Sequence, residues 1–172
     1  GEKNTAVGLS ASQNNTTGNR NVAMGYTALF TNTTGEKNTS IGYENMYANT
    51  TGEQNVSIGY VSFYANTTGS YNTALAPYAL RLNTTGDSNT AVGYQSLYSN
   101  TTADNNTAVG YNALYANTTG TQNIAIGALA GDAITTGDEN IIIGYTAAAS
   151  AVNSTNQIVI GRGVTGNANT SF

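Results

Sequence analysis

The sequence has no cysteine, no histidine and no tryptophan, and it carries little charge. Without cysteine there is neither a disulfide nor a thiolate metal site, and without histidine the commonest general base is missing. Only 8% of the residues are charged, five of them basic and nine acidic, so no basic stripe is available for phosphate contacts. No apolar run approaches the roughly 20 residues of a membrane-spanning helix. We therefore expect no enzyme, no cofactor, no metal, no nucleic-acid partner and no membrane span.

What the sequence does contain is a repeat of 17 residues, recognised by the segment Asn-Thr-Ala-Val-Gly. Phased apolar positions argue against a disordered low-complexity tract, and a fixed period predicts a repeat architecture. We number each unit from its asparagine as position 1. These residues are Asn4, Asn21, Asn38, Asn55, Asn72, Asn89, Asn106, Asn123 and Asn140, with Gln157 in the tenth unit.

The units fall into two groups along the chain. Residues 1–130 are regular, whereas residues 131–172 lose the tyrosine and leucine pattern and form degenerate repeats. The sequence opens in mid-unit without an initiator methionine, so we expect an excerpt of a longer fibre protein.

Positions 1–5 read as a short strand. Position 2 is β-branched, position 3 is usually small, position 4 is always apolar and position 5 is glycine in all units but one, where Ala76 precedes Pro77. Alternation places positions 2 and 4 on one face and position 3 on the other. We assign position 4 to the core, which leaves the small residues at position 3 free to face a neighbouring chain.

Positions 6–15 are less certain from sequence. Position 9 is mostly large and apolar, as in Leu29 and Leu97, and tyrosine recurs at positions 6 and 10. This spacing fits either a second extended segment with leucine inward and tyrosine outward, which we favour, or one helical turn. The Asn-Thr-Thr-Gly that follows is typical of a turn.

Stacking of these units predicts an all-β β-solenoid, or parallel β-roll, of ten 17-residue repeats. Ten turns at about 4.8 Å each would give a rod about 48 Å long. Identical asparagines at position 1 would then form an amide ladder along the rod.

The units also resemble known repeats. Residues 106–120, NTAVGYNALYANTTG, and residues 153–161, NSTNQIVIG, are similar to repeats of phage and bacterial tail-fibre and adhesin-like proteins. They are similar too to the shorter head repeats of trimeric autotransporter adhesins. The resemblance implies a β-roll or β-solenoid, often a homotrimer, located on the cell surface or in a virion appendage.

The commonest motif is Asn-Thr-Thr, an acceptor sequence for N-glycosylation when it is exposed. It predicts a row of glycans along one edge, although plain turn chemistry explains the same motif, and the flanking threonines offer O-linked sites instead. The candidate asparagines are Asn15, Asn32, Asn49, Asn66, Asn83, Asn100 and Asn117.

Tyrosine rows are the second candidate surface, because tyrosine joins an apolar ring to a polar tip and suits contacts with sugars or a partner. The simpler reading is a ladder that covers the flank of the rod. The candidate contact residues are Tyr43, Tyr47, Tyr60, Tyr64, Tyr94, Tyr98, Tyr111 and Tyr115.

Two further features are the acidic residues of position 16 and the threonine pairs of positions 13 and 14. Acidic residues at position 16, such as Glu53 and Asp104, offer oxygen ligands for Ca²⁺, but a solvated edge that discourages aggregation explains them better. The threonines at positions 13 and 14 are adjacent rather than two apart, which disfavours an ice-binding face.

From these observations we expect a structural component of an extracellular fibre or surface appendage, a rod with a repetitive surface whose Asn-Thr-Thr edge is a candidate for glycosylation. The alternative is an adhesin or tail-fibre module that binds host-surface glycans. The expected partners are copies of the chain itself, as a homotrimer or an end-to-end fibre, and glycans.

Overall fold

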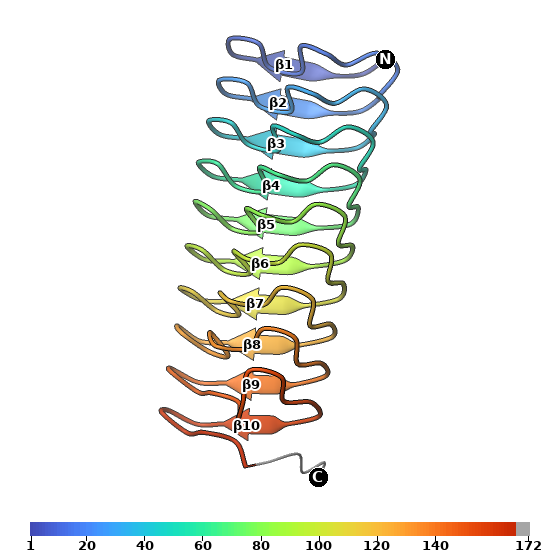
Figure 1. Cartoon of the computed structure of the whole chain (residues 1–172). Helices are drawn as coiled ribbons and strands as arrows, with labels where there is room; N and C mark the ends of the chain where they lie inside the picture. Colours follow the sequence, from blue (N-terminus) through green and yellow to red (C-terminus); the bar gives the residue numbers. More distant parts are fainter. Residues whose placement is uncertain (168–172) are drawn as a thin grey trace.

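The computed structural model describes residues 1–167 as a single stack of parallel strands (Figure 1). Each strand has three residues and pairs with the next at a shift of 17 residues, as in Thr5 with Val22 and Thr90 with Thr107. The expected β-solenoid is therefore confirmed. The strands are β1 (Thr5–Val7), β2 (Val22–Met24), β3 (Thr39–Ile41), β4 (Val56–Ile58), β5 (Thr73–Leu75), β6 (Thr90–Val92), β7 (Thr107–Val109), β8 (Ile124–Ile126), β9 (Ile141–Ile143) and β10 (Ile158–Ile160).

The strands form one ten-stranded sheet in sequence order, and each turn of chain contacts the turns before and after it. The described part of the chain contains no helix. Nor does it contain any helix long and apolar enough to cross a membrane. In Figure 1 the turns follow one another from the N-terminal end to β10, and the degenerate repeats keep the same pairing through β9 and β10.

The inward face of the strands is position 3, so the assignment of position 4 to the core is wrong. Ala23, Ala91 and Ala108 are fully buried, whereas Ile58 and Ile126 at position 4 are 43% and 41% exposed. The small residue points inward because the leucine of position 9 fills the same narrow interior. Position 3 therefore does not face a neighbouring chain. The side chains of positions 2 and 4 point outward, and we call the surface that they form the outer sheet face.

The eighth and ninth turns show the volume limit directly. Gly131 replaces the usual leucine at position 9, and Ile142 replaces the usual small residue at position 3. A Cβ added at Gly131 would lie 3.3 Å from Cδ1 of Ile142 and 3.4 Å from Cδ1 of Ile134. The larger side chain at position 3 of the ninth turn thus fills the space left by the missing side chain at position 9 of the eighth, as close packing requires.

The second half of each unit is neither an extended strand nor a helical turn, contrary to both readings of the sequence. Positions 7 and 9 have positive φ, as in Thr27 at 46° and Leu29 at 54°. This curls the chain so tightly that positions 8 and 9 both face inward, and Ala113 and Leu114 are both fully buried. Backbone bonds still run along the axis, since Leu29 N–H donates to the Asn45 carbonyl at 2.9 Å. The prediction that the leucine of position 9 points inward and the tyrosines point outward is nevertheless confirmed.

Candidate functional surfaces

The asparagines of the Asn-Thr-Thr motifs lie inside the rod. All of them from Asn32 to Asn117 are fully buried, and Asn15 is half-buried. Each side-chain amide donates to the carbonyl of the glycine or alanine three residues later, and also to Oδ1 of the asparagine one turn before. For Asn66 these distances are 2.9 Å to Gly69 and 2.7 Å to Asn49.

This placement argues against the expected N-linked glycans at Asn15, Asn32, Asn49, Asn66, Asn83, Asn100 and Asn117. A glycan would replace an amide hydrogen that is already donated, in a space that packed neighbours fill. The motif is instead a column of hydrogen bonds that satisfies buried carbonyls. The burial of these asparagines could not be predicted, because an exposed glycosylation site and a buried turn asparagine can have the same Asn-Thr-Thr sequence.

The asparagines of position 1 form the expected amide ladder. Asn72 Oδ1 accepts the Asn89 backbone N–H at 2.9 Å, and the Asn72 amide donates to the Gly86 carbonyl at 2.8 Å. The Asn89 amide also reaches Asn72 Oδ1, at 3.2 Å. Two buried amide columns therefore run along the rod on either side of the position-15 carbonyl.

The threonines divide into two columns with different roles. Position-13 hydroxyls donate to the carbonyl of the equivalent threonine in the next turn, as Thr67 does to Thr84 at 3.0 Å. Position-14 threonines, such as Thr68 and Thr85, are exposed. One exposed column does not make the paired threonine columns of an ice-binding face.

The acidic residues of position 16 join a third column, at the edge of the turn. Asp104 accepts the backbone N–H of Asp87 at 2.7 Å, and Asp138 accepts that of Thr121 at 2.7 Å. They cap N–H groups that the turn leaves free. Within residues 1–167 no group of three or more acidic side chains is arranged to hold a metal ion.

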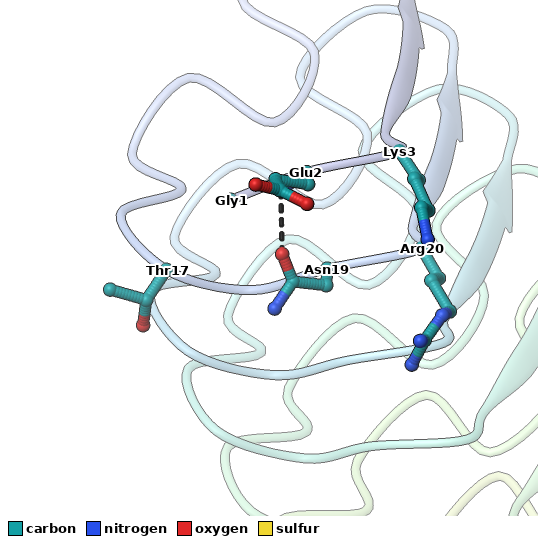
Figure 2. A pocket seen from close by; sticks show the side chains of 6 residues that line it. All are labelled: Gly1, Glu2, Lys3, Thr17, Asn19 and Arg20. Carbon is teal, nitrogen blue, oxygen red and sulfur yellow. Dashed lines mark hydrogen bonds between the residues drawn. The ribbon is translucent and has the colours of Figure 1, made fainter.

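At the first turn this column lines a shallow hollow (Figure 2). The backbone N–H of Glu2 donates to Asn19 Oδ1 at 2.5 Å, and Lys3 lies above Arg20 along the same edge. The hollow continues the contacts of position 16 and position 17 and contains no separate cluster of reactive side chains.

The eight candidate tyrosines form two rows along the outside of the rod. The position-6 row contains Tyr43, Tyr60, Tyr94 and Tyr111, and the position-10 row contains Tyr47, Tyr64, Tyr98 and Tyr115. Within each row neighbouring rings are stacked, as Tyr43 on Tyr60 with centroids 5.3 Å apart and Tyr98 on Tyr115 at 5.3 Å. Position-6 rings are the more exposed, and position-10 rings are half-buried. Stacking covers ring faces and leaves ring edges and hydroxyls facing solvent.

One member of the position-6 row has a shifted titration. Partial burial raises the pKa of the Tyr43 hydroxyl above its ordinary value. The neighbouring Glu44 carboxylate raises it further, both through its charge and by accepting a hydrogen bond, and Tyr26 and Tyr60 add smaller increases. Ionisation of the Tyr43 hydroxyl is therefore disfavoured.

The fifth turn interrupts both rows. Ala76 replaces the position-5 glycine with φ of 124°, and Pro77 replaces the position-6 tyrosine. Tyr78 fills that place in the row with its ring edge-on to both Tyr60 and Tyr94, at interplanar angles of 83° and 89°. Arg81 occupies position 10, where its guanidinium donates to the Tyr98 hydroxyl at 2.7 Å and lies 5.7 Å from the Tyr98 ring centroid.

The eighth turn leaves the position-6 row open. Ala128 stands where a tyrosine would, between Tyr111 in the turn before and Tyr145 in the turn after. Arg162 takes position 6 in the tenth unit and packs its guanidinium 5.7 Å from the Tyr145 ring centroid. Sequence reasoning missed this vacancy, although alignment of the units on their asparagines reveals it.

Replacing Ala128 by tyrosine should stabilise the rod. The new ring would stack on Tyr111 and Tyr145, and each aromatic pair contributes about 0.5–1.5 kcal/mol. We expect the free energy of unfolding to rise by about 1–3 kcal/mol, measured by urea denaturation. Thr119→Tyr, at an exposed position outside the rows, serves as the control and should change stability little; equal effects of the two substitutions would contradict the stacking explanation.

No family model matches the chain, and neither the curated proteins nor the solved structures contain a match.

Proposed function

We propose that this chain is a structural rod within an extracellular fibre or surface appendage. The observation that carries the proposal is the unbroken axial bonding from β1 to β10. Backbone groups, buried asparagine amides and threonine hydroxyls all bond to the adjacent turn. Such an array provides length and a regular surface, and its stability comes from interfaces between neighbouring turns. The resemblance to tail-fibre and adhesin repeats supports the same role and an extracellular location.

Gold-labelled antibody against the rod, applied to the intact cells or virions that produce it, tests the proposal by electron cryo-tomography. We expect label along filaments or surface projections. Label confined to the cell interior after permeabilisation, with none on the surface, would contradict it.

Self-association is the second part of the proposal, and the outer sheet face supports it. This face presents Val, Ile, Leu or Met at position 4 of every turn, beside Thr, Val or Ile at position 2, and carries no charge. At about 3.3 Å per residue the three-residue strands make this face about 10 Å wide, and ten turns make it about 48 Å long. It would therefore bury on the order of 500 Å² per copy, at the small end of specific interfaces. A second copy has the matching repeat along its whole length.

Analytical ultracentrifugation of the chain and of Ile58→Lys tests this association. We expect a dimer or trimer that dissociates in Ile58→Lys, because a lysine on the outer sheet face would have to lose its hydration. Thr68→Lys, on the exposed threonine column, is the matched control and should leave the assembly intact. A monomer at all concentrations would contradict the proposal.

The alternative function, an adhesin or tail-fibre module that binds host-surface glycans, is favoured by the exposed tyrosine hydroxyls along the rod. Binding to a glycan array should be lost when Tyr94, Tyr98, Tyr111 and Tyr115 are all replaced by alanine. A rod with a purely structural role would lose stability in this variant and would bind no glycan before or after the change.

Modification of the surface is now expected on threonine. The position-14 threonines are exposed, whereas the motif asparagines are buried. Intact mass and peptide mapping of natural material across residues 83–120 should find any hexose-sized increments on Thr85, Thr102 or Thr119, and none on Asn83, Asn100 or Asn117. A glycan found on any of these asparagines would contradict the buried amide column.

A further inference from the structure

The position-6 row fills almost every turn from the second to the tenth with a flat group. Rings of Tyr26, Tyr43, Tyr60, Tyr78, Tyr94 and Tyr111 follow one another at centroid distances of 5.1–5.8 Å. The planar guanidinium of Arg162 continues the row beyond Tyr145. The exception is Ala128, whose methyl group leaves one layer of the row empty.

The backbone register places Ala128 directly between two tyrosines. Leu129 N–H donates to the Tyr111 carbonyl at 2.8 Å, and Thr146 N–H donates to the Ala128 carbonyl at 2.9 Å. Tyr111 and Tyr145 are thus two strand spacings apart, about 9.6 Å. One ring inserted midway would lie about 4.8 Å from each, near the spacing that the filled parts of the row show.

The two walls of this vacancy are the Tyr111 and Tyr145 rings, and among residues 1–167 neither stacks on another aromatic ring across the Ala128 layer. Tyr94 stacks on one side of Tyr111 with an interplanar angle of 7°, and Arg162 covers one side of Tyr145. The opposite sides face the empty layer. Tyr111 and Tyr145 are 52% and 53% exposed, more than any other ring of the row; Tyr60, for example, is 47% exposed.

We propose that this vacancy, the Ala128 slot, binds a planar aromatic ring that enters edge-on and stacks between Tyr111 and Tyr145. The chemistry follows from the walls and the floor. Two ring faces attract a third flat ring by offset stacking, and the residue at the base of the empty layer is the apolar Ala128. A sugar would have to place hydroxyls against that floor without hydrogen-bond partners, which disfavours it.

Titration with indole and with p-cresol tests the slot. The chain contains no tryptophan, so indole fluorescence can be followed directly. We expect saturable, millimolar binding of one ring per chain. Binding should disappear in Ala128→Tyr and in Ala128→Leu, which fill the slot with different side chains, and should weaken at least several-fold in Tyr145→Leu. Tyr43→Leu removes a ring from the closed part of the row and is the matched control with unchanged binding.

The amide-capped peptide Gly-Tyr-Gly separates two sources of the ring. Binding of both p-cresol and the peptide would assign the slot to an aromatic side chain of a protein partner, whereas binding of p-cresol alone would assign it to a free aromatic compound. The proposal is overturned if neither ring binds, if both slot-filling variants bind as well as the original chain, or if methyl β-glucoside binds in the slot and p-cresol does not.

Discussion

Replacing Asn72 by alanine is expected to lower the free energy of unfolding by about 2–6 kcal/mol. The substitution leaves the Asn89 backbone N–H without a partner in the interior, which costs about 1–3 kcal/mol, and the Gly86 carbonyl keeps only its hydrogen bond from the Asn83 amide. It also removes the amide contact to Asn55 Oδ1. Because neighbouring turns stabilise one another, a break in the fifth turn weakens the coupling of the two halves of the rod.

Chemical denaturation followed by circular dichroism measures this effect. Thr85→Ala is the matched control, since Thr85 is exposed and lies in the same turn, and it should change stability by less than about 0.5 kcal/mol. If Asn72→Ala cost no more than the control, the amide ladder would not be a source of stability.

Replacing Gly110 by alanine should be about as damaging, with an expected loss of about 3 kcal/mol or more. Gly110 has φ of +142°, a region that costs a side chain about 1–3 kcal/mol. In addition, the new Cβ would lie 2.5 Å from the Gly127 carbonyl oxygen and 2.6 Å from its carbon. Both atoms belong to the backbone of the next turn, so the clash can be relieved only by separating the turns.

The fifth turn supplies the reverse experiment. Ala76 already occupies position 5 with φ of 124°, so Ala76→Gly should raise stability, by up to about 2 kcal/mol. Thermal midpoints of the two variants should therefore move in opposite directions. A fall in both would show that local backbone strain does not limit position 5.

The sequence was sufficient to predict the stack of turns but not its inside and outside. Alternation shows that positions 2 and 4 share a face, yet it does not say which face is buried. The larger residues of position 4 suggested the core, whereas the narrow interior accepts only a small residue opposite Leu97 or Leu114. The exchange of volume between Gly131 and Ile142 was present in the sequence, but its meaning depends on knowing that the two residues meet.

The positive φ values at positions 7 and 9 were beyond sequence reasoning for a different reason. Leucine, methionine and phenylalanine disfavour that conformation, as at Met46 and Phe63, so composition gave no hint of it. It is maintained because packing of the side chain and axial bonding on both sides outweigh the local cost. The same packing buries the asparagines of the Asn-Thr-Thr motifs and leaves the tyrosine edges exposed. The polarity of the side chains predicts the exposed tyrosine edges but not the buried asparagines.

The buried position-12 amides all point the same way. Each one donates toward the preceding turn, from Asn32 to Asn15 onward, and the column stops at Asn117 because Ile134 has no amide to continue it. The Asn117 oxygen consequently has no hydrogen-bond partner among the described residues. Aligned dipoles add, as they do in a helix, so this amide column is polarised along the axis of the rod with its negative end toward β8. The interaction between the dipoles of two such columns favours an antiparallel arrangement when the rods lie side by side. When the rods are joined end to end, it favours the same direction for both.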